Sequence, residues 1–266
     1  MSKATAFFAY SVGKKAVMAL TGLFLVSFLV IHMSGNLQLF TQNPVAFNEY
    51  TRFMTHSPFI KLSEFILVAG FLLHIFMAVR LTRLNADARP EKYHYKKEGE
   101  SSSWMSRNMG LTGSIILIFL GVHLYMFYGM YHYGTGESVD ASVAYKDVWK
   151  LTQPVTVTLK NVHVTLAEGD FLTEAAADAL QGQKVTGVSM YKVAAEAFKQ
   201  WWIVLFYLGS MVLMALHLRH GFQSAFRTLG LVHKKYTPLI DFAGIALCIV
   251  VPLIFALMPV YHFFVG

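Results

Sequence analysis

The first long apolar stretch of the chain reads AVMALTGLFLVSFLVIHMSGNLQ and covers residues 16–38. It contains no Asp, Glu, Lys or Arg, and a helix of this length crosses roughly 30 Å of hydrocarbon. Four further stretches have a similar length and apolar character, at about residues 59–83, 107–132, 201–228 and 238–263. Because helices satisfy their own backbone hydrogen bonds in lipid, we predict an all-α polytopic membrane protein with five transmembrane helices, forming one domain over residues 1–266.

The composition supports this class. Apolar residues make up 55% of the chain and charged residues only 14%, whereas a soluble domain has about 25% charged residues. The single cysteine, Cys248, lies inside an apolar run, which excludes an intrachain disulfide and an all-cysteine iron–sulfur site. We expect no cleavable signal peptide, because the first apolar run has full spanning length.

The basic side chains predict the orientation. Three segments hold 14 of the 22 Lys and Arg residues: Lys3, Lys14 and Lys15; Arg80, Arg83, Arg89, Lys92, Lys96, Lys97 and Arg107; and Arg219, Arg227, Lys234 and Lys235. The positive-inside rule therefore predicts a cytoplasmic N-terminus and an external C-terminus. This distribution accounts for the net charge of +7 without a nucleic-acid partner, and a basic inner face suits membrane lipid of negative charge.

Residues 133–200 are predicted to form an extended external loop between the third and fourth helices. Residues 154–166 alternate around Lys160 and Asn161 and predict a short hairpin, and residues 170–180 predict a short helix that ends near Gly182. No catalytic pattern occurs here, so an external cap or packing element is the expected role. No internal repeat stands out along the chain.

Four histidines stand out, one within each of four successive predicted spans: His32, His74, His123 and His217. An ionisable side chain in a membrane span is a functional hypothesis by default, because its burial is costly. A single histidine of this kind could instead form a hydrogen bond to a neighbouring helix. The regular distribution over four helices favours a cofactor.

The depths of these histidines predict two layers. His32 and His123 each lie roughly 24 Å from the cytoplasmic ends of their helices, whereas His74 and His217 lie roughly 14 and 16 Å from theirs. Two axial histidines from facing helices hold a b-type haem for electron transfer, and filled axial positions disfavour oxygen chemistry. We predict two haem b groups, an inner one on His74 and His217 and an outer one on His32 and His123. Zinc is disfavoured, because no Cys or carboxylate accompanies these histidines at short spacing.

The surrounding residues fit such a cofactor. Small residues would give a macrocycle room near the backbone, and they include Gly35, Gly70, Gly113, Gly121 and Gly221. Haem propionates need cationic partners, for which Arg80, Arg83 and Arg219 are candidates; the alternative is ordinary snorkelling of these arginines to the interface.

Four motifs carry a resemblance to a known family. They are His32-Met-Ser-Gly-Asn-Leu-Gln-Leu-Phe40; Leu73-His-Ile-Phe-Met-Ala-Val-Arg80, followed by Asn85 and Ala88-Arg-Pro90; Gly121-Val-His-Leu-Tyr-Met-Phe127; and His217-Leu-Arg-His-Gly-Phe-Gln-Ser-Ala-Phe-Arg-Thr-Leu-Gly230. Together they resemble the diheme cytochrome b membrane anchor of succinate dehydrogenases and fumarate reductases, over all five helices. The fourth motif, a His followed four residues later by Gly, implies that His217 rather than His220 is the ligand, and leaves His220 as a candidate for hydrogen bonding to a propionate or a quinone.

The resemblance implies a multi-pass subunit of succinate:quinone oxidoreductase in a bacterial cytoplasmic membrane. A flavoprotein subunit and an iron–sulfur subunit would dock on the cytoplasmic face, and electrons would pass through the two haems to a quinone, usually menaquinone. No dicarboxylate active site is expected in this chain, and the oligomeric state of the complex is left open. The long loop departs from the family, as does Ala215, where some fumarate reductase anchors carry a glutamate for proton movement.

Quinone contacts are predicted from polar residues near the outer haem. The candidates are Asn36, Gln38, Glu49, Lys61 and Glu64, with Arg52 and His56 beside them. Glu64 stands out as a carboxylate at membrane depth, although it could simply bond to the outer loop. On the inner side, Ser27, His220 and Asp241 are further candidates.

Two other functions remain open from the sequence. One is the cytochrome b subunit of a hydrogenase, formate dehydrogenase or nitrate reductase, which also carries several histidines in its spans. The other is a transporter whose histidines relay protons. Transporters usually show inverted repeats and interrupted helices, and only the last span, with Pro252 and Pro259, could be interrupted.

Overall fold

The computed structural model describes residues 10–88, 104–135, 137–141, 144, 150–159, 162–167, 170 and 172–265. Some residues used above lie outside these ranges: Lys3, Arg89, Pro90, Lys92, Lys96, Lys97, Lys160 and Asn161. The chain divides into two compact units, which are treated separately below. Unit 1 comprises Met1–Met33, Lys61–Ile118 and Tyr207–Ala256, and unit 2 comprises Ser34–Ile60, Phe119–Phe206 and Leu257–Gly266.

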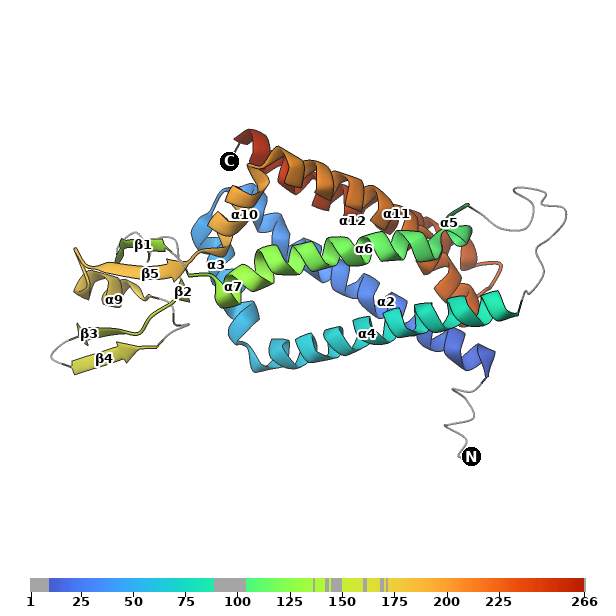
Figure 1. Cartoon of the computed structure of the whole chain (residues 1–266), viewed down its shortest axis with the longest axis horizontal. Coiled ribbons are helices and arrows are strands. Elements are labelled where there is room, and N and C mark those ends of the chain that lie inside the picture. The colour runs from blue at the N-terminus through green and yellow to red at the C-terminus, as the bar shows by residue number, and fades with distance from the viewer. Residues whose placement is uncertain are drawn as a thin grey trace, which may run out of the picture. The chain divides into compact units, whose positions relative to one another are not determined.

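Five helical segments are long and apolar enough to cross a membrane, as predicted: Ser11–Thr41, Pro58–Asp87, Met109–Tyr133, Trp201–Thr228 and Thr237–Val265. They consist of α2 (Ser11–Asn36) with the 3-10 turn η1 (Leu37–Thr41); α4 (Pro58–Asp87); α6 (Met109–His123) with the π-helical turn η2 (Leu124–Gly129) and α7 (Met130–Tyr133); α11 (Trp201–Thr228); and α12 (Thr237–Val265). In unit 1, parts of all five segments lie alongside one another (Figure 1).

The predicted bounds are close to the observed ones, and the fourth span matches at both ends. The largest difference is at the start of α2, which begins at Ser11 instead of residue 16. Lys14 and Lys15 lie within its first turns. Long lysine stems can reach the interface while the backbone stays helical, so these charges do not end the helix.

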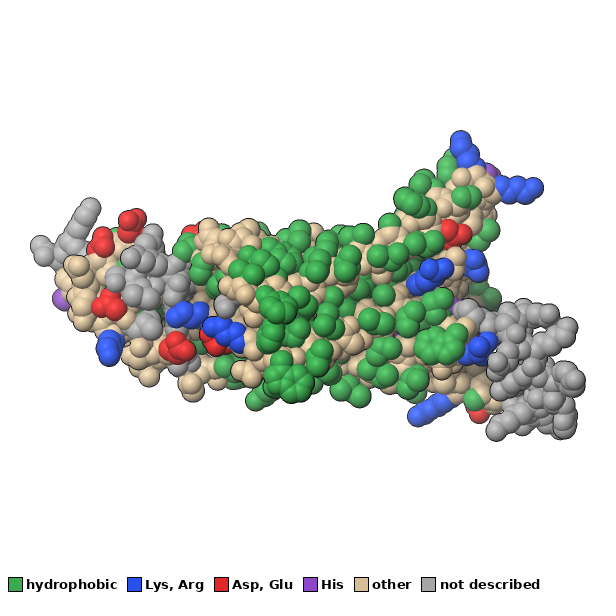
Figure 2. All heavy atoms as spheres, turned by 90° about the horizontal axis from the view of Figure 1, so that it is seen from above, with side chains coloured by type: hydrophobic (Ala, Val, Ile, Leu, Met, Phe, Trp, Pro, Cys, Tyr) green, Lys and Arg blue, Asp and Glu red, His purple; other side chains and the backbone are tan. Residues whose placement is uncertain are grey.

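The long helices present apolar side chains outward. Phe65 and Leu72 on α4 are 75% and 60% exposed, and Met77 is the buried residue of that helix. Figure 2 shows hydrophobic side chains covering the surface of these helices. Exposed apolar surface of this extent would be unfavourable in water but suits hydrocarbon, so the chain is a membrane-spanning protein.

A short helix between the first two spans belongs to unit 2 and was not predicted. Helix α3 (Pro44–His56) begins after Asn43, whose side chain accepts a hydrogen bond from the Ala46 N–H at 3.1 Å. Proline at the first helical position and asparagine at the cap are strong start signals. Its polar composition made this segment look like a loop.

The segment between α7 and α11, residues 137–200, is called the cap segment here and also belongs to unit 2. Strands β1 (Glu137–Asp140), β5 (Lys184–Val188) and β2 (Lys150–Leu151) form an antiparallel sheet in that order. Strands β3 (Val155–Leu159) and β4 (Val162–Leu166) form the predicted hairpin, in which Val157 pairs with Val164. The predicted short helix is α9 (Glu174–Ala179), capped by Thr173.

The cap segment has a small hydrophobic core of its own. The core residues are Ala141, Ala144, Leu151, Val157, Leu172, Ala176, Leu180 and Val185, and each is at most 2% exposed. After α9 the chain turns at Gly182, whose φ of +78° is readily adopted by glycine. The turn returns the chain to β5, so this core is built like that of a small soluble protein.

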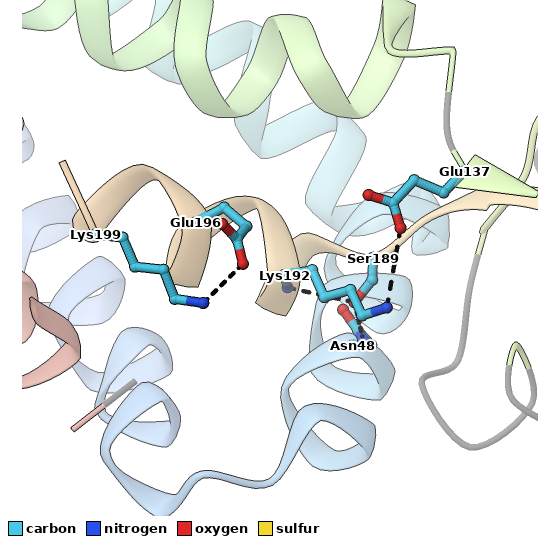
Figure 3. A network of polar contacts seen from close by, with 6 residues as sticks. All are labelled: Asn48, Glu137, Ser189, Lys192, Glu196 and Lys199. Carbon is cyan, nitrogen blue, oxygen red and sulfur yellow. Dashed lines mark hydrogen bonds and ion pairs between the residues drawn. The ribbon is translucent and has the colours of Figure 1, made fainter. Parts of the chain in front are cut away.

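Asn48 ties α3 to α10 (Met190–Phe198) within unit 2. Its side-chain amide donates to Ser189 Oγ at 2.9 Å (Figure 3). Its oxygen accepts from the Tyr191 N–H at 3.1 Å. Asn48 is 2% exposed. The nearby ion pairs of Lys192 with Glu137 and of Lys199 with Glu196 are largely exposed and contribute little. The buried amide is therefore the main polar link between these two helices.

Replacing Asn48 by alanine should loosen α10. The change leaves Ser189 and the Tyr191 N–H without their buried partner, which costs about 1–3 kcal/mol and corresponds to roughly a 5- to 150-fold change in a local opening equilibrium. Limited proteolysis of the cap segment in detergent should accelerate accordingly. Thr156→Ala, which removes an exposed hydroxyl contact to Thr165, is the matched control and should leave the cleavage rate unchanged. Equal cleavage rates for Asn48→Ala and the control would contradict the assignment.

Candidate functional site

His74 projects from α4 and is held by two residues of α2, all within unit 1. Its Nδ1 lies 3.1 Å from Thr21 Oγ1. The next residue, Gly22, presents a bare backbone to the ring, because a Cβ built there would lie 3.4 Å from His74 Cε1. The threonine hydroxyl and the glycine together form a seat for the imidazole.

His217 on α11 has the same kind of seat, formed by α6 and also within unit 1. Its Nδ1 lies 3.2 Å from Thr112 Oγ1, and a Cβ at Gly113 would lie 3.1 Å from His217 Cε1. Both histidines thus have Nδ1 paired with a threonine hydroxyl and one edge of the ring against a glycine. Neither Nε2 makes a hydrogen bond among the described residues.

The other two predicted ligands have aromatic surroundings. The ring of His32 stacks on Phe28, with centroids 5.3 Å apart and planes at 18°, and lies 5.6 Å from Phe255. The ring of His123 stacks on Phe119 at 5.8 Å and 30°. His32 lies in unit 1 and His123 in unit 2, so their pairing remains a prediction.

The helix that carries His123 changes its winding directly after that residue. The π-helical turn η2 covers Leu124–Gly129, and Phe127 within it lies 5.1 Å from the His123 ring. Single π turns in otherwise α-helical segments occur frequently at functional sites, because the extra residue redirects the neighbouring side chains. The turn therefore adds to the reasons for regarding His123 as functional.

Clusters of three or more His, Cys, Asp or Glu side chains arranged to hold a metal ion do not occur among the described residues. Such clusters are typical of zinc or carboxylate-bridged centres. An iron held in a haem takes only two ligands from the protein, and in a bundle they come from two different helices. The arrangement of His74 and His217 is compatible with the latter kind of site.

A cavity of about 390 Å³ lies in unit 1 close to His217 along α11. It is lined by Val12 and Lys15 of α2 and by His220, Gln223, Ser224, Arg227 and Thr228 of α11. Of these, His220 was singled out from the sequence, whereas Lys15 and Arg227 were assigned only to the topology. Their charges and the neighbouring hydroxyl and amide groups could bind an anionic group.

The remaining predicted pocket residues fall into distinct settings. Arg80, Arg83 and Arg219 are exposed, so snorkelling remains an alternative for them. Gly121 has open space where a side chain would project, and Gly221 faces Met109 Cε at 3.5 Å. The space beside Gly35 is filled within unit 2, because the Tyr50 hydroxyl lies where a Cβ of residue 35 would be. Burial raises the pKa of Tyr50, which therefore stays a neutral hydroxyl.

The outer quinone candidates are brought together only in part. In unit 2, an open groove of about 570 Å³ on α3 is lined by Glu49, Arg52, Phe53, His56 and Ser57. Asn36 and Gln38 lie in the same unit and are half-buried, at the end of α2 and in η1. Lys61 and Glu64 are exposed on α4 and belong to unit 1.

The inner quinone candidates also lie apart within unit 1. Gln223 donates to Asp241 at 3.0 Å, which joins α11 to α12, and Ser27 donates to the Phe24 carbonyl of its own helix. Only His220 lines the cavity. Asp241 therefore has a structural partner that sequence reasoning did not anticipate.

A histidine of the last span was not among the predicted ligands. His262 lies in the last turn of α12 and is 1% exposed, with Tyr191 and Phe198 of α10 at ring distances of 5.8 and 6.2 Å. These residues belong to unit 2. Both ring nitrogens of His262 are buried and have no hydrogen-bond partner among the described residues.

Comparison of the chain with models of protein families, with curated proteins and with solved structures found no match.

Proposed function

We propose that this chain is a diheme cytochrome b that anchors a succinate:quinone oxidoreductase in a bacterial cytoplasmic membrane. The observation that carries the proposal is the matched geometry of His74 and His217. Each imidazole is seated in unit 1 on a neighbouring helix, with Nδ1 paired to a threonine hydroxyl and Nε2 without a hydrogen bond among the described residues.

This geometry is what an axial haem ligand needs. A histidine that binds iron through one ring nitrogen generally donates the other N–H to an acceptor in the protein, which fixes the tautomer and the orientation of the ring. Two such histidines come from α4 and α11, and their seats come from α2 and α6. A bound haem supplies one-electron chemistry at an iron whose axial positions are both filled.

The cavity beside His217 supports the position of the haem edge. His220 lies one turn after His217, and Lys15 and Arg227 line the same cavity. Haem propionates are carboxylates, and charge-assisted hydrogen bonds from cationic side chains are about twice as strong as neutral ones. These three residues would hold the propionates of the inner haem, because they line one cavity together, whereas Arg80 and Arg83 do not line it.

The second haem follows from the order of residues along the helices. His32 lies eleven residues after Thr21, and His123 lies eleven residues after Thr112, which is about 16 Å along a helix. His32 and His123 lie the same step beyond the two threonines, and we propose them as the ligands of the second haem. Electrons would then cross most of the hydrocarbon within one chain.

The proposed partners follow the resemblance in the four ligand motifs. A flavoprotein subunit and an iron–sulfur subunit would deliver electrons on the cytoplasmic side, and a quinone, in this class usually menaquinone, would accept them. The groove on α3 combines a carboxylate and an imidazole, Glu49 and His56, with Arg52 between them. Such groups can exchange the protons that accompany quinone reduction, and they line one groove, so this groove is the favoured quinone site over Glu64, which lies outside it.

Spectra of histidine variants test the ligand assignment. The purified wild-type chain should show two low-spin b haems in its reduced-minus-oxidised spectrum. His74→Ala and His217→Ala should each remove the same haem, because they remove the two ligands of one iron. His220→Ala removes the alternative ligand and should retain both haems, because it leaves both axial ligands of each iron in place. A colourless wild-type protein would refute the proposal, and loss of a haem only in the His220 variant would refute the choice of ligand.

The cavity assignment predicts a change in redox potential. Arg227→Gln should lower the midpoint potential of the inner haem, because removing a positive charge beside the propionates favours the more positive, oxidised haem. Lys235→Gln is the matched control, since Lys235 lies in the loop between α11 and α12 and outside the cavity. Redox titration followed by optical spectra measures both. If the midpoint potential shifts equally in both variants, or in neither, the propionates do not lie beside Arg227.

The class of complex is tested by its activity and its partners. Affinity purification of the chain from its native membrane should bring down a covalently flavinylated subunit and an iron–sulfur subunit, and the preparation should oxidise quinol with fumarate. Variants at His74 should lose this activity while the flavoprotein still oxidises succinate with a soluble dye. Co-purification of a hydrogenase or formate dehydrogenase subunit instead would assign the chain to that other class of cytochrome b.

A further inference from the structure

Helices α2 and α6 contain the same residues at the same spacing. Residues 20–32 read LTGLFLVSFLVIH and residues 111–123 read LTGSIILIFLGVH. Both follow the pattern Leu-Thr-Gly, five residues, Phe-Leu, two residues, His. Reading the sequence alone identified no repeat, because apolar spans resemble one another everywhere and only the shared contacts single out these positions.

The threonine, glycine and phenylalanine of the pattern make the same contacts in both helices. The threonines Thr21 and Thr112 pair with Nδ1 of a histidine on the following span, at 3.1 and 3.2 Å. The glycines that follow them lie against the Cε1 edge of that same histidine. The phenylalanines stack on the histidine of their own helix, Phe28 on His32 and Phe119 on His123. The two helices therefore share contacts at these positions as well as residue types.

The direction of the threonine–histidine hydrogen bond follows from the backbone. Thr21 Oγ1 donates to the Val17 carbonyl at 2.9 Å, one turn earlier in its helix. Thr112 Oγ1 makes the corresponding bond to the Asn108 carbonyl at 3.2 Å. A carbonyl oxygen cannot donate, so the single hydroxyl proton is used there and the hydroxyl oxygen remains as an acceptor.

The histidine must then be the donor. A neutral imidazole carries one N–H, and a hydroxyl oxygen that accepts from Nδ1 places that proton on Nδ1. Nε2 is left unprotonated, with its lone pair directed away from the seat. The threonine thus selects the tautomer that can bind a metal through Nε2, and the bare glycine beside it lets the ring lie close to the neighbouring helix.

We propose that Thr21 and Thr112 are paired positioning residues for one haem, and that α2 and α6 are two copies of a single ligand helix. Each copy supplies a ligand to the outer haem and positions the ligand that the following span supplies to the inner haem. This inference rests on the proposed diheme function and adds to it the residues that orient the inner ligands. A hydrogen bond from the histidine Nδ1–H to the threonine oxygen makes Nε2 more basic. Both threonines therefore favour the oxidised state of the same haem.

Valine and serine variants separate this role from simple packing. Valine keeps the shape of threonine but cannot accept a hydrogen bond, whereas serine keeps the hydroxyl and loses the methyl group. In the intact complex, Thr21→Val and Thr112→Val should each raise the midpoint potential of the inner haem and weaken haem retention by roughly 10- to 100-fold. Thr21→Ser and Thr112→Ser should retain the wild-type potential.

Thr51 provides the matched control. Its hydroxyl makes the same bond to the carbonyl one turn earlier, Phe47 at 2.9 Å, on helix α3 of unit 2. Thr51→Val should leave both haem potentials unchanged. The pairing of the two threonines is overturned if Thr21→Val and Thr112→Val shift different haems. A positioning role is overturned if the serine variants are impaired while the valine variants behave as wild type.

A measurement without haem keeps the inference separate from the proposed function. Nitrogen-15 spectra of the full-length chain from a haem-deficient host should show His74 and His217 as Nδ1–H tautomers, and Thr21→Val should alter the His74 signals but not those of His217. A wild-type chain with Nε2–H tautomers overturns the inference. A wild-type chain that has the expected tautomers but takes up no haem would refute the proposed function and leave the hydrogen bonds established.

Discussion

Hydrocarbon offers no hydrogen-bond partners, and this constraint governs the structure. The backbone of the five spans meets this constraint by forming helices. A polar side chain within a span needs a hydrogen-bond partner of its own. His74 and His217 meet it through a hydroxyl of a neighbouring helix, supplied by Thr21 and Thr112. The threonines in turn bond their own helix backbone, so no polar group in either seat is left without a partner except the nitrogen that the proposed function uses.

The cap segment is organised by a different constraint. Outside the long helices, alternating side chains can face water on one side, and its strands and α9 enclose a small core around Leu151 and Val157. The buried amide of Asn48 joins this part of unit 2 to α3. The chain therefore combines elements whose apolar surface faces lipid with elements whose apolar surface faces inward.

The sequence predicted the spans well and singled out His74 and His217, because hydropathy and the presence of an imidazole in an apolar run are local signals. It did not predict the partners of those histidines. Thr21 and His74 are 53 residues apart, and Thr112 and His217 are 105 residues apart, so their pairing depends on helix packing and leaves no local pattern. The three-stranded sheet was missed for the same reason, since β1 pairs with β5 across the whole hairpin and α9.

The repeat also provides a second reference for the depths of the histidines. Depth measured from a helix end is sensitive to that end, and α2 begins at Ser11 instead of residue 16, which shifts the apparent depth of His32 by about 8 Å. The threonines replace the helix end with an internal reference. Thr21 lies at the level of His74 and Thr112 at the level of His217, and the same eleven-residue step leads to His32 and to His123. If α2 and α6 are copies of one helix, the proposed assignment of histidines to two layers rests on the step within each helix and does not depend on where the membrane begins.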